Sequence, residues 1–335
     1  MPAWELRRKN RNRRWIAVLA VVLLSSLLFG GVGFAAYTNN ILLTGYWPPT
    51  GGEGGMLNQW LYDPYNPETW QGANWNNSGY DVYALYPTFP GGTGSNPRGD
   101  GFFEIHYDSV YDDFAGVTTT GMWVDHSLTE DPVWMDPLNP VAILSYGQGN
   151  GPWEIENNAR NLTRRNWYRT SYSGRPDQKP DLTLPNNYTL SASDLSSDMA
   201  MMNQNVEDAV NAANLPGIGT DGAWVDWNGN PGAFLCEYMA FLGLDYYYWN
   251  GPDAAESDPD APPYENDYTV YATSFTHVAG NVPESSGAVA TEISLNETMW
   301  FLDNTLPPFQ PVPIPEPLWL LSPTLLFLLR FRRQV

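Results

Sequence analysis

The chain has 335 residues, with 37 acidic against 16 basic side chains and a formal net charge of −21 at pH 7. Such an excess of negative charge repels phosphate backbones, and it therefore excludes nucleic acid as an expected partner. The single cysteine excludes an internal disulfide framework. Roughly 270 residues lie between two unusual ends, enough to bury a sizeable core.

The N-terminal segment, residues 1–36, has the layout of a secretory signal. Basic residues crowd the first 14 positions, and an apolar run from Trp15 to Ala36 follows and ends in small residues. We expect export with cleavage near Ala35 or Ala36. The alternative is an uncleaved membrane anchor, because the run is long enough to span a bilayer. In both cases the basic end stays in the cytoplasm and the main body lies outside.

The C-terminal segment, residues 315–335, has three parts in a fixed order. Pro315-Glu316-Pro317 precedes an apolar stretch, Leu318 to Leu329, and then the basic cluster Arg330-Phe331-Arg332-Arg333. This order resembles the PEP-CTERM sorting signal of exported bacterial proteins. The resemblance implies Sec export, recognition by an exosortase, membrane contact through the terminal segments, and a location in or outside the envelope of a Gram-negative-type bacterium. The alternative is a short membrane tail, although about 12 apolar residues span a bilayer poorly.

The body between these ends is predicted to be an α/β domain beginning at residue 81. Residues 37–80 are rich in Gly, Pro, Asn and aromatic residues and predict an irregular lead-in. The predicted strands lie at 81–86, 141–146, 223–225 and 268–275, and the predicted helices lie at 205–213 and 286–302. Strands alternating with helices indicate a three-layer α/β/α sandwich with a largely parallel sheet. Residues 250–267 predict an exposed acidic loop, and residues 304–314 a Pro-rich linker.

The only cysteine lies in Gly232-Ala233-Phe234-Leu235-Cys236, where a glycine turn leads into an apolar, helix-forming run. A thiol near the start of a helix can be activated, because the positive end of the helix favours the thiolate. The ordinary alternative is a small buried hydrophobic residue. The surroundings of the thiol decide between these two interpretations.

A carboxylate, a cysteine and a histidine follow in chain order at Glu156, Cys236 and His277. A thiol is a weak nucleophile until a base takes its proton. Histidine can serve as that base, and a carboxylate can orient its imidazole. His277 ends a β-rich run, whereas His106 and His126 lie in polar segments that contain aspartate. The alternative for His277 is a histidine packed at a strand end.

Four short motifs occur in order along residues 81–303. They are Tyr86-Pro87-Thr88-Phe89 with Gly91-Gly92 and Asn96-Pro97; Gly147-Gln148 with Ile155-Glu156, Ala159 and Asn161; Gly232-Ala233-Phe234-Leu235-Cys236; and Phe275-Thr276-His277-Val278. Together they resemble the signatures of the pyroglutamyl peptidase I family of cysteine peptidases. The first signature of that family is a phenylalanine-rich loop after the first strand.

The resemblance implies hydrolytic removal of an N-terminal pyroglutamate from a peptide substrate, without a metal or an organic cofactor. Cys236 would attack the carbonyl, His277 would carry the proton, and Glu156 would orient His277. The implied substrate-binding residues are Tyr86 and Phe89, which would enclose the lactam ring, and Gln148 and Leu235, which would complete the pocket.

Several departures from the family pattern bear on specificity and activity. Pro152 stands near the place of a usual arginine, the glycine turn is shorter, and the stretch 250–267 separates Cys236 further from His277. Glu237 replaces the usual asparagine after the cysteine, and its negative charge would oppose thiolate formation.

Two other interpretations of the chain remain open. Asp226-Trp227-Asn228-Gly229-Asn230 supplies oxygen atoms at alternate positions, and Glu237 falls at the twelfth position of an EF-hand calcium loop. Against this, Pro231 stands where the loop needs a glycine with positive φ. The other alternative is a catalytically inactive cell-surface or matrix protein on the same fold, which would suit the acidity and the 15 tryptophans.

Overall fold

The computed structural model describes residues 38–45, 55–62, 67–85, 122–125, 131–134, 138–162, 180–181, 183–229, 231–232, 235–252 and 269–306. The chain divides into two compact units, residues 1–36 and 37–335, and every described residue lies in the second. Both predicted sorting segments lie outside the described residues, as do most of the linker and of the acidic loop. Within the described ranges, no helix is both long and apolar enough to cross a membrane.

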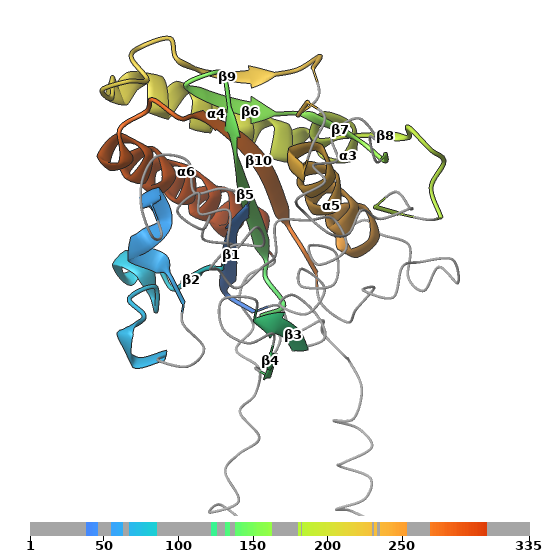
Figure 1. The fold of residues 1–335 in the computed structure, drawn as a ribbon, viewed down its shortest axis with the longest axis horizontal. Coiled ribbons are helices and arrows are strands. Elements are labelled where there is room, and N and C mark those ends of the chain that lie inside the picture. The colour runs from blue at the N-terminus through green and yellow to red at the C-terminus, as the bar shows by residue number, and fades with distance from the viewer. Residues whose placement is uncertain are drawn as a thin grey trace, which may run out of the picture. The chain divides into compact units, whose positions relative to one another are not determined.

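Six of the described strands form one sheet (Figure 1). In spatial order they are β2 (Asp81–Ala84), β1 (Asn40–Gly45), β5 (Ala142–Gly149), β10 (Ala272–Ala279), β6 (Trp153–Glu156) and β9 (Ala223–Asp226). Neighbouring strands run parallel except β10 and β6, which are antiparallel. The predicted α/β class with a largely parallel sheet is confirmed.

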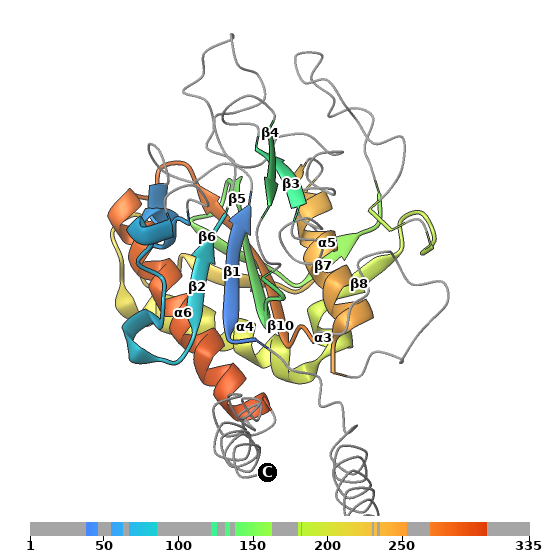
Figure 2. The same ribbon diagram turned by 90° about the horizontal axis from the view of Figure 1, so that it is seen from below.

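Helices cover both faces of this sheet (Figures 1 and 2). Tyr146 of β5 faces Thr291 and Ser294 of α6 (Glu284–Thr305). The next residue, Gly147, lies against Cys236 of α5 (Leu235–Asn250). Successive strand residues point to opposite faces, so α6 and α5 lie on opposite sides of the sheet. The helix α4 (Ser197–Ala213) packs beside α6 and completes the third layer.

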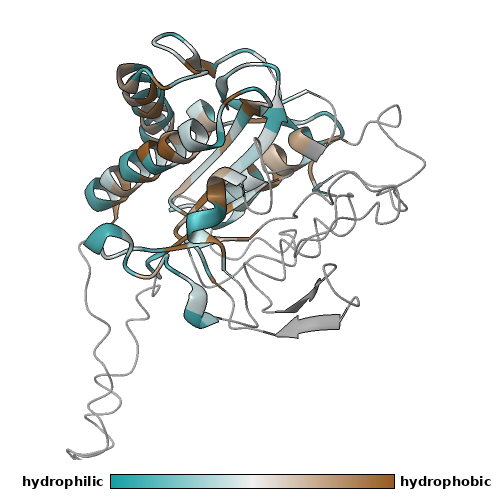
Figure 3. Ribbon diagram, turned by 60° about the vertical axis from the view of Figure 1, so that its left-hand side comes forward, coloured by the Kyte–Doolittle hydropathy of each residue, from teal (hydrophilic) through white to brown (hydrophobic). Residues whose placement is uncertain are grey.

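The core is built from strands that are buried on both faces. Ile41, Leu42 and Leu43 of β1 and Ile143 of β5 have no exposed surface. Continuous apolar runs of this kind are typical of parallel strands covered by helices on both sides. The face of α6 toward the sheet also includes Thr291, whose hydroxyl donates to a carbonyl one turn earlier and is therefore buried with a partner. Figure 3 shows hydrophilic and hydrophobic residues alternating along the helices.

The other described elements are short. β3 (Met122–Asp125) pairs with β4 (Asp131–Trp134), and β7 (Asn158–Arg160) pairs with β8 (Thr189–Ser191), both antiparallel. A four-residue helix, α3 (Ala192–Leu195), precedes α4. Three 3-10 helices lie at Gly55–Trp60, Pro67–Thr69 and Trp75–Asn77.

The prediction that residues 37–80 form an irregular lead-in is wrong. Asn40–Gly45 forms β1, which lies between β2 and β5 in the sheet. The sheet therefore begins about 40 residues before the predicted boundary at residue 81. The reason for the error is that only three apolar residues mark this strand, among glycines, prolines and aromatic residues, so periodicity does not reveal it.

Candidate active site

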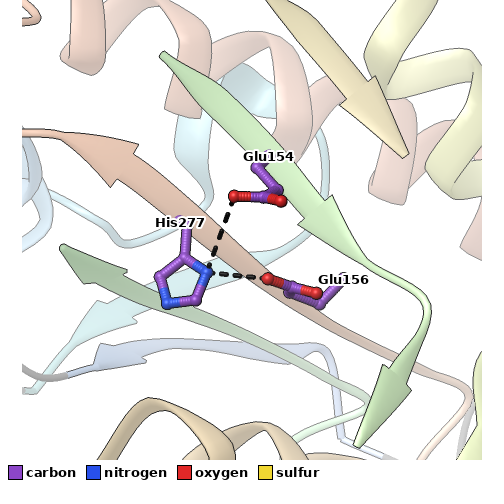
Figure 4. A group of neighbouring side chains, drawn as sticks. All are labelled: Glu154, Glu156 and His277. Atoms are coloured by element: carbon purple, nitrogen blue, oxygen red, sulfur yellow. Dashed lines mark hydrogen bonds and ion pairs between the residues drawn. The ribbon is translucent and has the colours of Figure 1, made fainter. Parts of the chain in front are cut away.

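His277 and two glutamates lie on adjacent strands. His277 on β10 pairs directly with Glu154 on the antiparallel strand β6, and Glu156 is two residues further along β6. Residues two apart on a strand point to the same face, so both carboxylates share the face of His277. Figure 4 shows the two carboxylates converging on one nitrogen of the imidazole.

The contact between Glu156 and His277 is short and buried. Nδ1 of His277 and Oε1 of Glu156 are 2.7 Å apart, whereas Oε2 of Glu154 is 4.0 Å from the same nitrogen. His277 is 7% exposed and Glu156 is 5% exposed. Nδ1 donates to the carboxylate of Glu156, so the other ring nitrogen is left to exchange protons with a third group.

Cys236 lies in the first turn of α5, above the same face of the sheet. A Cβ atom built on Gly147 would lie 2.8 Å from Sγ of Cys236 and 3.5 Å from Cδ2 of His277. The thiol and the imidazole therefore meet over one glycine, and Cys236 is near enough to raise the pKa of His277. The free N–H groups of a first helical turn favour negative charge at this sulfur.

The surroundings of His277 change its affinity for a proton. Burial lowers the pKa of His277, but hydrogen bonds and charges of Cys236 and Glu156 outweigh burial and raise the pKa from 6.5 to about 10. Burial raises the pKa of Glu156, and the hydrogen bond and charge of His277 act in the opposite direction. An imidazolium that faces a carboxylate on one side and a sulfur on the other is suited to stabilising a thiolate.

The raised pKa of His277 predicts a specific dependence of stability on pH. The folded value, about 10, exceeds the unfolded value of 6.5, so the contribution is complete below about pH 6.5 and is lost as the pH rises toward 10. We expect the free energy of unfolding in urea to fall over this range. In Glu156→Gln the fall should be smaller, because one cause of the raised pKa is removed. Equal slopes in the two proteins would contradict this assignment.

Gly147 leaves no room for a side chain between Phe275 and Cys236. A methyl group there would lie 2.7 Å from Cζ of Phe275 and 2.8 Å from Sγ of Cys236, so one side chain must move. For Gly147→Ala we expect a loss of stability of about 1–3 kcal/mol and slower alkylation of the Cys236 thiol, since the thiol would be displaced from its place over the imidazole. Thermal unfolding and thiol alkylation measure the two effects.

The control for Gly147→Ala is Ser145→Ala, on the same strand and the same face. The hydroxyl of Ser145 is buried without a hydrogen-bond partner among the described residues, so its loss should change little. Unchanged alkylation in Gly147→Ala would show that the close contact with Cys236 is unimportant.

The charge of Glu237 is paired within the fold. Glu237 is 1% exposed, and its Oε1 accepts the backbone N–H of Arg160 at 2.8 Å. The guanidinium of Arg160 lies 3.4 Å from Oε1 through Nε and 3.5 Å from Oε2 through Nη2. The expected opposition of Glu237 to a thiolate at Cys236 is therefore offset by an adjacent positive charge.

The EF-hand hypothesis for residues 226–237 is wrong. Asp226 ends the strand β9, and its Oδ1 accepts the backbone N–H groups of Asn228 at 3.0 Å and Gly229 at 2.7 Å. Glu237 pairs with Arg160 instead of turning toward a shared ion. A calcium loop needs the oxygens at its first and twelfth positions on one cation. Here the carboxylate of Asp226 accepts from the turn at Asn228 and Gly229, and the carboxylate of Glu237 pairs with Arg160.

One group of side chains has the composition of a metal site. Ligand atoms of Glu154, Glu156 and His277 lie within 4.8 Å of one another. A metal ion there would have to replace the hydrogen bond between Nδ1 and Glu156. Because Cys236 adjoins the same ring, the arrangement is better suited to orienting an imidazole for proton transfer.

The predicted substrate-binding residues are only partly placed by the structure. Gln148 is exposed at the end of β5, next to Gly147, and its amide lies beside Gly280. Leu235 begins α5, and its side chain lies outside the described atoms. Tyr86 and Phe89 lie outside the described residues. The strand before them, β2, is also the second in the chain and is separated from β5 by β1. The strand before Tyr86 is therefore not the first strand of the chain, and the substrate-binding role of Tyr86 and Phe89 stays a prediction.

Two residues beside the site were missed by sequence reasoning. Glu154 could have been found from the alternation in Glu154-Ile155-Glu156, which places two carboxylates on one face of a strand. No pattern in the sequence indicates that Arg160 pairs with Glu237. In contrast, Asn161 of the second motif has a structural role, because its buried amide bonds the backbone of Asp181 in both directions.

No family model matches this chain, and no curated protein matches it. Among solved structures, the fold is similar to pyroglutamyl peptidase I from Bacillus amyloliquefaciens, with a TM-score of 0.44 and 13% identity over 78% of this chain and 98% of that chain. A mutant pyrrolidone carboxyl peptidase from the hyperthermophile Pyrococcus furiosus gives 0.43 and 13% over 78% and 99%. Pyrrolidone carboxyl peptidase from Thermococcus litoralis gives 0.43 and 13% over 80% and 96%.

Proposed function

We propose that this chain is an exported cysteine peptidase-like hydrolase that removes an N-terminal pyroglutamate, or a related cap, from peptides. The observation that carries the proposal is the short bond between Glu156 and His277, with the thiol of Cys236 over the same imidazole. Three side chains from three separate elements provide a nucleophile, a base and an orienting carboxylate. The four motifs of the sequence supply the substrate class.

The reaction proceeds in two stages. The Cys236 thiolate attacks the carbonyl carbon of the pyroglutamyl amide, and backbone N–H groups at the start of α5 stabilise the resulting oxyanion. The C–N bond breaks as the His277 imidazolium gives its proton to the departing amine, which leaves a thioester on Cys236. Water, deprotonated by His277, then attacks the thioester carbonyl, and the C–S bond breaks to restore the Cys236 thiolate beside the His277 imidazolium. Pyroglutamic acid leaves and loses its proton to solvent. Glu156 holds the imidazole throughout.

The proposal is tested by release of a fluorophore from a pyroglutamyl amide, with wild type beside Cys236→Ala. Activity in the wild type and its loss in the variant are expected. Activity that remains in Cys236→Ala would contradict the proposed role of Cys236 as the nucleophile. If neither protein is active while both are folded, the chain is better described as an inactive cell-surface protein on this fold or as a hydrolase for another cap.

The corrected order of the strands predicts where the substrate ring binds. The resemblance assigns ring binding to an aromatic loop after the first strand, and that strand is β1, whose last residue, Gly45, pairs with Tyr146 of β5. Tyr46 is the next residue, and Tyr46-Trp47-Pro48-Pro49-Thr50-Gly51-Gly52 also combines aromatic residues, prolines and a glycine pair. Tyr46→Ala should therefore raise KM by about tenfold, for a lost aromatic contact worth about 1 kcal/mol or more. Tyr86→Ala is the matched control, and a larger effect there would restore the original assignment.

Export forms a separate part of the proposal and has its own test. The N-terminal layout and the C-terminal tripeptide, apolar stretch and basic cluster support secretion by the Sec machinery and recognition by an exosortase. Mass spectrometry of the protein from the producing cells should find an N-terminus near Ala36 and a C-terminus near Pro315. A full-length chain retained in the inner membrane would contradict cleavage and support the anchor.

A further inference from the structure

We propose that Glu154 and Trp224 bind the side chain of the residue that follows the cap, and that they favour an arginine there. This proposal rests on the proposed function and deepens it, because it names the class of peptide that the hydrolase takes. Neither residue is part of the nucleophile, the base or the orienting carboxylate.

Four positions on four neighbouring strands form a row across the sheet beside the thiol. In register, the row runs through Gly147 of β5, His277 of β10, Glu154 of β6 and Trp224 of β9. Residues paired in this way point to the same face, which is the face that Cys236 covers at Gly147. Strands lie about 4.8 Å apart, so Glu154 is two spacings, or about 10 Å, from the glycine beneath the thiol.

The direction of this row matches the direction in which the peptide leaves. In the sheet, β1 and β10 flank β5 on opposite sides. The cap is assigned to the loop after β1, and His277 on β10 gives its proton to the departing amine. The amine therefore lies on the β10 side of the thiol. A long side chain on the residue that carries this amine extends over β6 and β9, toward Glu154 and Trp224.

The charge at this end of the row suits a cation. The side chain of Glu154 is 22% exposed, and its Oε2 lies 4.0 Å from Nδ1 of His277. Asp226 pairs in register with Glu156, and its charge acts on both glutamates. Three carboxylates therefore share this face with one imidazole, and the excess of negative charge attracts a cationic side chain.

Trp224 provides an aromatic surface next to this carboxylate. A Cβ atom built on Gly151 would overlap Cη2 of Trp224, so the indole lies against the backbone of the glycine turn before β6. The indole is partly exposed, and Glu154 is its partner on the neighbouring strand. A planar guanidinium can stack on an indole while it donates to a carboxylate, which favours arginine over lysine.

Three peptides that differ only after the cap test the proposal: pyroglutamyl-Arg-Ala, pyroglutamyl-Gln-Ala and pyroglutamyl-Glu-Ala. We expect wild type to cleave the arginine peptide with a kcat/KM about tenfold above that of the glutamine peptide, for one contact to a charged group, and the glutamate peptide more slowly still. Glu154→Gln should bring the ratio of arginine to glutamine close to one, and Trp224→Leu should lower it. A purely structural effect would slow all three peptides alike and leave the ratio unchanged.

The matched control is Asp208→Asn, which removes an exposed charge from α4 on the opposite side of the sheet and should keep the wild-type ratio. If wild type showed no preference for arginine, or if Glu154→Gln kept the preference, the binding site would be wrong and the peptidase would stand.

A titration without turnover separates this proposal from the proposed function. If wild type cleaves none of the peptides, the peptidase is rejected, and calorimetric titration with argininamide tests the binding site alone. Wild type should bind argininamide about tenfold more tightly than Glu154→Gln does, and more tightly than it binds glutaminamide. Equal affinity of wild type and Glu154→Gln, or no binding to wild type, would overturn the proposal.

Discussion

Replacement of His277 by alanine is expected to lower kcat/KM for a pyroglutamyl amide by about 10³-fold, within the range for loss of a positioned general acid and base. The imidazole is the group that contacts both Glu156 and Cys236. In the proposed mechanism, its removal takes away the counter-charge of the thiolate and the proton donor for the leaving amine. Steady-state kinetics measure the effect, with circular dichroism as the check on folding.

The two neighbouring glutamates provide a matched comparison for this result. Glu156→Gln should reduce turnover more than Glu154→Gln, because Glu156 is 2.7 Å from Nδ1 and Glu154 is 4.0 Å from it. The order of loss should therefore be His277→Ala, then Glu156→Gln, then Glu154→Gln. If His277→Ala kept more than a tenth of wild-type activity, or if the two glutamate variants were reversed, the assigned roles would be wrong.

Replacement of Trp153 by alanine should reduce the free energy of unfolding by about 3–5 kcal/mol, as for other large core residues. Trp153 has no exposed surface and packs against Tyr146, with ring centroids 5.9 Å apart. It begins β6, the strand that carries Glu154 and Glu156, so the cavity would also loosen the orienting carboxylate. Urea denaturation followed by circular dichroism measures the change.

Trp153→Phe is the matched control for this experiment. The indole N–H of Trp153 is buried and has no hydrogen-bond partner among the described residues, so phenylalanine would lose packing volume without breaking a hydrogen bond. We expect it to cost less than half as much as alanine. If the alanine variant were as stable as wild type, the packing of Trp153 would not contribute to the stability of β6.

Strands and helices with a long apolar or helical run could be predicted from the sequence. A strand marked by only a few apolar residues could not. The residues of β5, β10 and α6 form continuous apolar or helical runs, and the sequence indicates each of them. The strand β1 was missed because its three apolar residues stand in a segment of glycine and proline. That single omission moved the predicted start of the domain, and it is the reason why Tyr86 and not Tyr46 was assigned to the loop after the first strand.

The sequence predicts which chemical groups form the candidate site, but it does not predict how their neighbours are arranged around them. Motif order selected Glu156, Cys236 and His277, and the structure brings these three residues together. The contribution of Glu154 depends on the antiparallel pairing of β6 with β10, and the neutralisation of Glu237 depends on β7 reaching α5. A single sequence does not indicate which distant segments pair. The roles of Glu154 and of the partner of Glu237 are therefore seen only in the structure.

The antiparallel register of β6 and β10 gives this site a tolerance for strand slippage. Because glutamates recur at positions 154 and 156, a slip of β6 by two residues would exchange one carboxylate for the other opposite His277. A slip by one residue would instead turn Ile155 toward the imidazole and both acids away from it. Insertions or deletions that change the length of the glycine turn before β6 by two residues should thus keep an acid beside the histidine. Changes of one residue should leave no acid beside the histidine.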